Sequence, residues 1–92
     1  MRIEFDPAKC QANIKTRGLS FERVAEFDFA TAAVEQDLRK PYPETRYVAL
    51  GWLDARLHVL CFTPTDDGLR VISFRKANAR ELRRYEKTPP TH

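Results

Sequence analysis

The amino-acid sequence predicts an α+β fold: a small antiparallel sheet with two N-terminal helices and a basic C-terminal helix. Three stretches between residues 46 and 75 alternate apolar and polar side chains, a period typical of strands. Stretches that begin near residues 7, 20 and 77 instead carry helix caps or helical spacing. The predicted order is β-α-α-β-β-β-β-α, with the helices segregated from the sheet.

The N-terminal part of the chain predicts one strand and two helices. Residues 1–5 alternate as a short strand, and Asp6-Pro7 supplies an N-cap followed by proline at the first helical position. This helix should end near residue 16, because Gly18 suits the left-handed conformation that follows a helix C-terminus. Ser20 then caps a second helix, which we expect to end near residue 28 or 29.

Four strands follow. Pro41 and Pro43 make the segment after the first of them a loop. Asp54-Ala55 and Asp67-Gly68 are turn sequences, so the last three strands should form a meander. The strands are predicted over residues 32–36, 46–53, 56–63 and 69–75. Simple alternation places one set of side chains of the last strand on one face: Leu69, Val71, Ser73 and Arg75.

Positive charge is concentrated between residues 70 and 87. Seven Lys and Arg against two acids give this stretch a net charge of +5, so the rest of the chain carries −2 of the total +3. Such a block favours a polyanion partner, with RNA or DNA first. The alternative is an ordinary solvated helix face.

Size and composition predict one domain. The 92 residues, 42% of them hydrophobic, suit a single core over residues 1–87, followed by a disordered tail at 88–92. No apolar run approaches the roughly 20 residues that span a bilayer, and no leader pattern is present, so we expect a cytoplasmic protein. Cys10 and Cys61 lack C-x-x-C spacing and predict two reduced thiols. With only His58 and His92 besides them, we expect neither a metal site nor a cofactor.

The junction between the last strand and the last helix holds the candidate catalytic residues. RNA cleavage without a metal needs a proton acceptor, a cation for the phosphorane and a proton donor. We assign Arg75 to phosphate stabilisation, Glu81 as base or positioner, and Tyr85 as acid or stacking group, with Ser73 beside them. Glu81 could equally pair with neighbouring helix arginines, and Tyr85 could pack on the sheet. His58 is more simply a buried, hydrogen-bonded histidine.

Other cations are candidates for binding RNA phosphates. Lys and Arg side chains suit this role because their charge and donors match phosphate oxygens. The predicted RNA-binding residues are Lys9, Arg17, Arg46, Lys76, Arg80, Arg83, Arg84 and Lys87.

Three groups of spaced residues along almost the whole chain carry a resemblance. The first is Phe5-Asp6-Pro7-Ala8-Lys9, then Asn13, then Thr16-Arg17-Gly18-Leu19-Ser20-Phe21-Glu22, with Ala25. The second is Arg46-Tyr47-Val48-Ala49-Leu50-Gly51. The third is Ile72-Ser73-Phe74-Arg75-Lys76-Ala77, with Glu81, Tyr85 and Glu86. Together they resemble the BrnT toxins of bacterial type II toxin–antitoxin modules, whose fold is similar to the RelE-like ribonucleases.

The resemblance implies a small cytoplasmic ribonuclease that arrests growth by cutting RNA. It also implies a partner, a DNA-binding antitoxin of the ribbon-helix-helix type. One departure is Arg17, where the family usually has histidine. If that histidine transfers a proton in relatives, this chain would have to use another group or be slower, while phosphate binding could survive or improve. The alternative from a different class is a non-catalytic basic module that docks a protein or nucleic acid.

Overall fold

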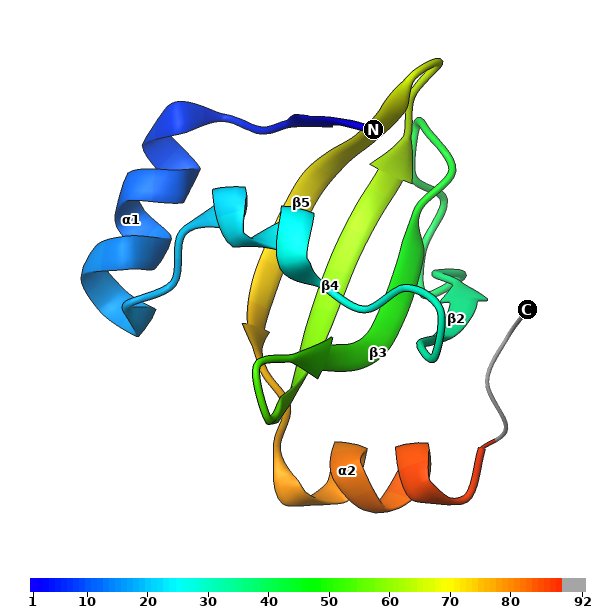
Figure 1. Ribbon diagram of the computed structural model, residues 1–92. Coiled ribbons are helices and arrows are strands. Elements are labelled where there is room, and N and C mark those ends of the chain that lie inside the picture. The colour runs from blue at the N-terminus through cyan, green and yellow to red at the C-terminus, as the bar shows by residue number, and fades with distance from the viewer. Residues whose placement is uncertain (89–92) are drawn as a thin grey trace.

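A five-stranded sheet forms the centre of the protein (Figure 1). The computed structural model describes residues 1–88. The strands are β1 (Arg2–Glu4), β2 (Ala33–Gln36), β3 (Tyr47–Leu53), β4 (Arg56–Pro64) and β5 (Gly68–Lys76). They lie in the order β1-β5-β4-β3-β2 across the sheet. The helices are α1 (Pro7–Arg17), the 3₁₀ helix η1 (Phe21–Glu26) and α2 (Ala79–Glu86), which confirms the α+β class.

The sheet is mixed, because β1 pairs in parallel with β5 while the other three pairs are antiparallel. The prediction of an antiparallel sheet is therefore wrong at this edge. Local alternation indicates a strand but not its neighbour, and the neighbour of β1 lies at the other end of the chain. A Cβ on Gly68 would overlap the carbonyl oxygen of Arg2, so this close approach requires glycine.

The second predicted helix is a 3₁₀ helix rather than an α-helix. Ser20 caps it as expected, with its hydroxyl accepting from the Glu22 N–H at 3.1 Å. Phe21, Val24 and Phe27 are spaced by three residues and are all buried. A 3₁₀ helix has three residues per turn, so Phe21 and Val24 of η1 lie on one face toward the sheet, and Phe27 follows as the C-cap residue.

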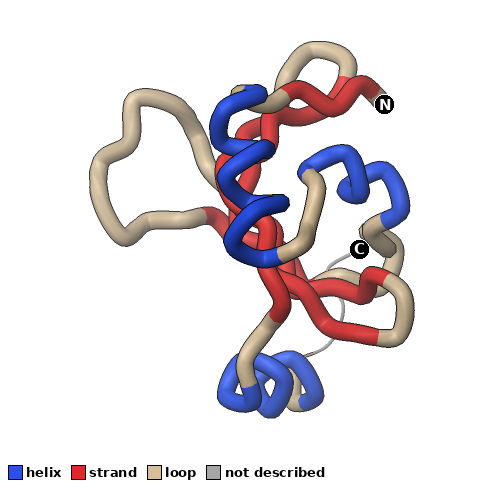
Figure 2. The backbone as a smooth tube through the Cα atoms, turned by 90° about the vertical axis from the view of Figure 1, so that its left-hand side faces the viewer, coloured by secondary structure: helices blue, strands red, loops and turns tan. Residues whose placement is uncertain are grey.

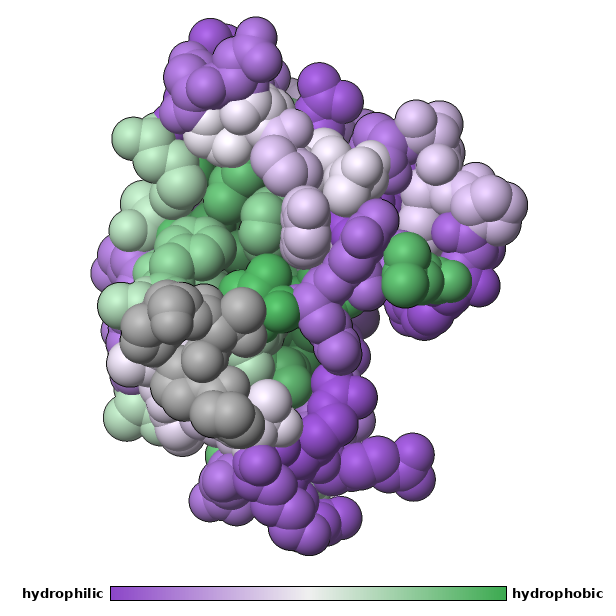
Figure 3. Space-filling model, turned by 90° about the vertical axis from the view of Figure 1, so that its right-hand side faces the viewer, coloured by the Kyte–Doolittle hydropathy of each residue, from purple (hydrophilic) through white to green (hydrophobic). Residues whose placement is uncertain are grey.

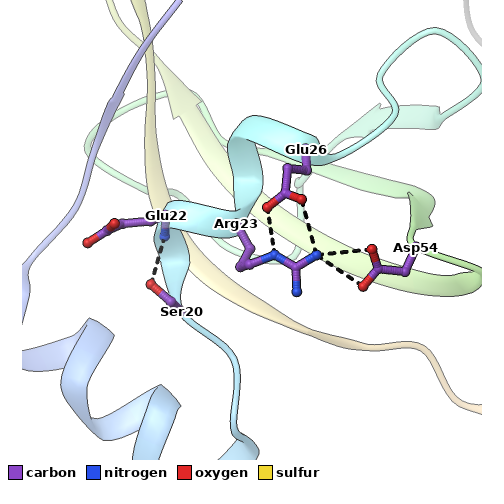
Figure 4. A network of polar contacts seen from close by, with 5 residues as sticks. All are labelled: Ser20, Glu22, Arg23, Glu26 and Asp54. Atoms are coloured by element: carbon purple, nitrogen blue, oxygen red, sulfur yellow. Dashed lines mark hydrogen bonds and ion pairs between the residues drawn. The ribbon is translucent and has the colours of Figure 1, made fainter.

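A polar network fixes η1 to the turn between β3 and β4 (Figure 4). The Arg23 side chain donates to both carboxylate oxygens of Asp54, at 3.0 and 3.1 Å, and to Glu26 at 2.7 Å. Asp54 has a φ of 54°, as the predicted tight turn requires.

The two faces of the sheet are covered differently. One face carries the main core, in which Leu60 and Phe74 are fully buried under η1 and Phe27. Burying a side chain of this size contributes about 1.5–3 kcal/mol. On the opposite face α2 covers Val59 and its neighbours through Leu82, and leaves the rest open. Figure 2 shows α1 at the edge of the sheet, η1 on one side, and the long loop before β3 projecting on the other.

A β-bulge in β5 decides which side chains reach the open face. Cys61 pairs with Ser73 and Phe62 with Val71, so Ile72 is an extra residue without a partner in β4. The bulge changes the alternation, which places Val71 in the main core and Ser73 on the opposite face. The prediction that Leu69 and Val71 share a face with Ser73 and Arg75 is therefore wrong.

The two remaining predictions concern membrane-spanning helices and the C-terminal tail. Within residues 1–88, no helix is long and apolar enough to cross a membrane. Of the predicted tail at 88–92, only Thr88 lies inside the described residues. Its N–H donates to the Tyr85 carbonyl at 3.1 Å and its hydroxyl to the Arg84 carbonyl at 2.8 Å, which extends the last turn of α2.

Candidate active site

Arg75 stands where β5 leaves the sheet, held by an ion pair with the first turn of α2. Its Nη1 and Nη2 donate to Oε1 and Oε2 of Glu81, each at 2.8 Å. The same carboxylate caps α2, because Oε1 also accepts from the Asn78 N–H at 2.9 Å, while the Glu81 N–H donates to Asn78 Oδ1 at 2.8 Å. This reciprocal arrangement is a capping box. The sequence left the partner of Glu81 open, and the structure assigns it to Arg75.

The ion pair fixes the charge of both partners. Glu81 is well shielded, with 17% of its side chain exposed, against 36% for Arg75. Hydrogen bonds from Arg75 lower the pKa of Glu81 to about 2, and the same contact raises the pKa of Arg75. A carboxylate held in this way stays ionised at neutral pH and is a poor proton acceptor.

One side of the Arg75 guanidinium remains available. Nη1 donates to Glu81 and, at 3.2 Å, to the Lys76 carbonyl, so both of its hydrogens are used. Nη2 uses one hydrogen on Glu81. Within residues 1–88, no hydrogen bond uses Nε–H or the second Nη2 hydrogen. These two donors are parallel, and such a fork matches two oxygens of a phosphate.

Arg75 and Ser73 separate two hollows, and the first is a cleft on the open face of the sheet. The cleft has a volume of about 350 Å³ and lies between α2 and the loop of residues 37–46. In Figure 3 the surface is indented between the projecting loop and the hydrophilic surface of α2. Its charged lining residues are Glu35, Asp37, Arg39, Arg75, Glu81 and Arg84.

The second hollow is a groove between α1 and the free edge of β5, with a volume of about 470 Å³. Asn13 fixes α1 in this position, since its amide donates to the carbonyls of Leu19 and Phe74, both at 2.9 Å. The polar lining residues are Lys9, Asn13, Thr16, Arg17, Ser73 and Arg75. The groove thus carries three cations and no carboxylate.

A comparison with known families decides what kind of protein this is. Residues 5–81 match the profile of the family described as "Ribonuclease toxin, BrnT, of type II toxin-antitoxin system". The chain belongs to the BrnT family of ribonuclease toxins. No curated protein matches the chain.

The BrnT match covers most of both hollows. It includes Lys9 and Arg17 in the groove, Arg75 between the hollows, and Glu81 as its last residue. The other residues of α2 after Glu81 lie outside the match. Arg17 lines the groove together with Arg75.

Most cations predicted to bind RNA lie outside the two hollows. Of those on α2 and at its ends, only Arg84 lines the cleft. The others are exposed and make no ion pair within residues 1–88: Lys76, Arg80, Arg83 and Lys87. Arg46 lies elsewhere, with its Nε donating to Glu44 at 3.0 Å and its guanidinium 4.1 Å above the ring of Tyr42.

Tyr85 and His58 face away from the cleft. The Tyr85 hydroxyl donates to the Thr31 carbonyl at 2.8 Å, and its ring packs edge-on against Trp52 at 5.7 Å. The structure therefore does not bring Tyr85 to Arg75. His58 is buried on the main-core face, with Nδ1 2.8 Å from the Arg56 carbonyl, and burial lowers its pKa. This confirms the prediction of a buried, hydrogen-bonded histidine.

Sequence reasoning missed the acidic side of the cleft. Asp37 has only 1% of its side chain exposed and accepts two hydrogen bonds from the Arg39 side chain, both at 2.8 Å. The hydrogen bonds from the Arg39 side chain keep the pKa of Asp37 well below its ordinary value. The available signal was an aspartate at the start of a loop, since the Arg39 N–H also donates to Asp37 Oδ1 at 3.2 Å in a local turn. Glu35 could have been found from its alternation with Val34.

The cysteines and the acids of this BrnT chain form no metal cluster. Cys10 and Cys61 are both free and buried, as expected of reduced thiols, and burial raises the pKa of Cys61. In the described part of the chain, no three His, Cys, Asp or Glu side chains gather in a way that could hold a metal ion.

Proposed function

We propose that this chain is the toxin of a type II toxin–antitoxin module and acts as a metal-independent endoribonuclease that arrests growth. The observation that supports it is the free Nε–Nη2 fork of Arg75, directed by the Glu81 ion pair and placed between two hollows. We also propose that residues 1–87 form one domain with a RelE-like fold. The protein would then act in the cytoplasm, under the control of a ribbon-helix-helix antitoxin.

In this proposal Arg75 stabilises the phosphorane. Attack of a 2′-hydroxyl on phosphorus adds negative charge to the non-bridging oxygens, and a preorganised cationic fork binds that state more tightly than the ground state. Glu81 is then a positioning residue, because its carboxylate holds the guanidinium and cannot easily accept a proton. Ser73, which lines both hollows beside Arg75, donates a hydrogen bond to the same phosphate.

We assign RNA affinity to the cations that surround Arg75. Lys9 and Arg17 bind the phosphates on one side of the scissile bond and Arg84 those on the other. The cations outside the hollows add long-range attraction that depends on ionic strength. They are Arg46, Lys76, Arg80, Arg83 and Lys87. Tyr85 supports the site by docking α2 on the sheet through Trp52.

The deciding experiment combines cleavage with growth. Purified protein should cut cellular RNA in the presence of EDTA, and its induction without an antitoxin should stop bacterial growth. A protein that binds RNA without cleaving it, and whose induction is harmless, would instead support a non-catalytic binding module. A protein whose cleavage is abolished by EDTA and restored by a divalent cation would contradict the metal-independent mechanism.

A further inference from the structure

The proposed ribonuclease lacks one component, a group that accepts the proton of the attacking 2′-hydroxyl. Such general bases usually contribute about 10²–10⁴-fold to a rate. Glu81 is held by Arg75, and Asp37 is held by Arg39. His58 is buried on the main-core face of the sheet. None of the three is available, so the inference below rests on the proposed function and completes it.

Glu35 is a carboxylate in the cleft with no partner of its own. Its side chain is exposed, and within residues 1–88 that side chain makes no hydrogen bond or ion pair. It lines the cleft together with Arg75, Ser73 and Arg84. In this respect it differs from Asp37 and Glu81, which are both locked in bidentate contacts with arginine.

The strand register places Glu35 opposite the candidate phosphate site. Glu35 of β2 pairs with Val48 of β3, Val48 with Cys61 of β4, and Cys61 with Ser73 of β5. These four residues form one row across the open face, so Glu35 and Ser73 are three strand spacings apart, or about 14 Å between Cα atoms. Glu35 and Arg75 line the same cleft, of about 350 Å³, from its β2 and β5 sides.

We propose that Glu35 is the general base of the cleavage reaction. The 2′-O–H bond breaks and its proton moves to the Glu35 carboxylate, while the 2′ oxygen forms a bond to phosphorus. The P–O5′ bond then breaks, and the leaving 5′ oxygen takes a proton from water in the open cleft. The products are a 2′,3′-cyclic phosphate and a 5′-hydroxyl, and Glu35 returns its proton to solvent.

The charged groups around Glu35 bear on how the cleavage rate depends on pH. The titratable and charged groups that face it come from α2, from the loop, and from β4 and β5. The contacts with arginine lower the pKa of both carboxylates among them, Asp37 and Glu81, and burial raises the pKa of the Cys61 thiol. These groups are Asp37, Arg39, Cys61, Arg75, Glu81 and Arg84.

The test is the single-turnover cleavage rate of a short RNA as a function of pH, in EDTA. Glu35→Gln should lower the plateau rate at least ~100-fold, leave RNA affinity unchanged, and remove the acidic limb of the profile. Glu81→Gln should be slower than wild type but keep that limb, because it only positions Arg75. Glu22→Gln, an exposed change on η1, is the matched control and should match wild type.

Each outcome bears on a definite claim. A wild-type protein that cleaves, with Glu35→Gln equally active, overturns the assignment of Glu35 and leaves the ribonuclease proposal intact. The same holds if the acidic limb persists in Glu35→Gln and disappears in Glu81→Gln, which would make Glu81 the base. A wild-type protein that does not cleave RNA overturns both proposals.

Discussion

The groove and the cleft differ in charge although they share Arg75 and Ser73. The groove is lined by three cations without a carboxylate, whereas the cleft carries three arginines and three carboxylates. A surface of one sign attracts a polyanion from a distance, while balanced charges attract it little and can instead move protons. We therefore expect the groove to supply affinity and the cleft to supply chemistry, with Arg75 serving both.

The largest effect should come from Arg75, because it belongs to both hollows. Arg75→Ala should reduce cleavage about a hundredfold or more, comparable to removing a preorganised oxyanion donor. RNA affinity should fall only slightly, since the other cations remain. Arg75→Lys should also be severely impaired, because an ammonium cannot hold Glu81 and present a planar fork at once. A folded Arg75→Ala variant that cuts RNA at the wild-type rate would remove the assigned site.

The next effect separates affinity from chemistry. Replacing Lys9 and Arg17 together by alanine should weaken RNA binding and lower the slope of log K against log salt by about 1.4, the value for two phosphate contacts on single-stranded nucleic acid. The rate at saturating RNA should change little. The matched control replaces Arg80 and Arg83, which line neither hollow, and should lose less affinity. A larger loss in the control would place the main RNA surface on α2.

The ion pair between Glu81 and Arg75 predicts a dependence of stability on pH. The pKa of Glu81 is lowered from an ordinary value of 4.5 to about 2 in the folded state. Its contribution is therefore fully present above pH 4.5 and is lost as the pH falls from there toward 2. Glu81→Gln should cost about 2 kcal/mol at pH 7, after allowance for solvent screening, and the difference from wild type should shrink below pH 4. Thermal unfolding of both proteins from pH 3 to 7 measures it, and parallel curves would contradict the assignment.

The smallest effect should come from Tyr85. Its hydroxyl makes one exposed hydrogen bond to the Thr31 carbonyl, so Tyr85→Phe should cost about 0.5–1 kcal/mol of stability. Cleavage should stay within about twofold of wild type, because the hydroxyl does not reach the cleft. A loss of cleavage of about a hundredfold in a stable Tyr85→Phe variant would restore Tyr85 as a proton donor.

Local sequence signals predicted the elements better than their partners. Asp6, Gly18 and Ser20 marked helix ends correctly, since caps depend on neighbouring residues. The parallel pairing of β1 could not be predicted, because it depends on a strand at the other end of the chain. The bulge at Ile72 was also hidden, since alternation appears unbroken in the sequence while the pairing with β4 shifts.

In the candidate site, too, contacts between residues close in sequence were predictable and contacts between distant residues were not. Ser73, Arg75 and Glu81 lie within one strand-to-helix junction, so their spacing was enough to predict that they meet. Glu35 and Arg39 reach the cleft from β2 and the following loop, which are distant in sequence and join it only through strand pairing. Tyr85 has helical spacing from Glu81, but its ring follows Trp52, a contact that spacing alone does not reveal.

The capping box of α2 makes the helix and the site a single cooperative unit. Glu81 caps the first turn and holds Arg75, while none of the eight residues of α2, all of them described, is fully buried. A short helix without a fully buried residue is a natural candidate for local unfolding before the sheet opens. Each such opening releases Glu81 and leaves Arg75 to rotate freely. Hydrogen exchange of the α2 amides therefore measures how often the phosphate fork is assembled, and the fraction of closed molecules sets an upper limit on activity.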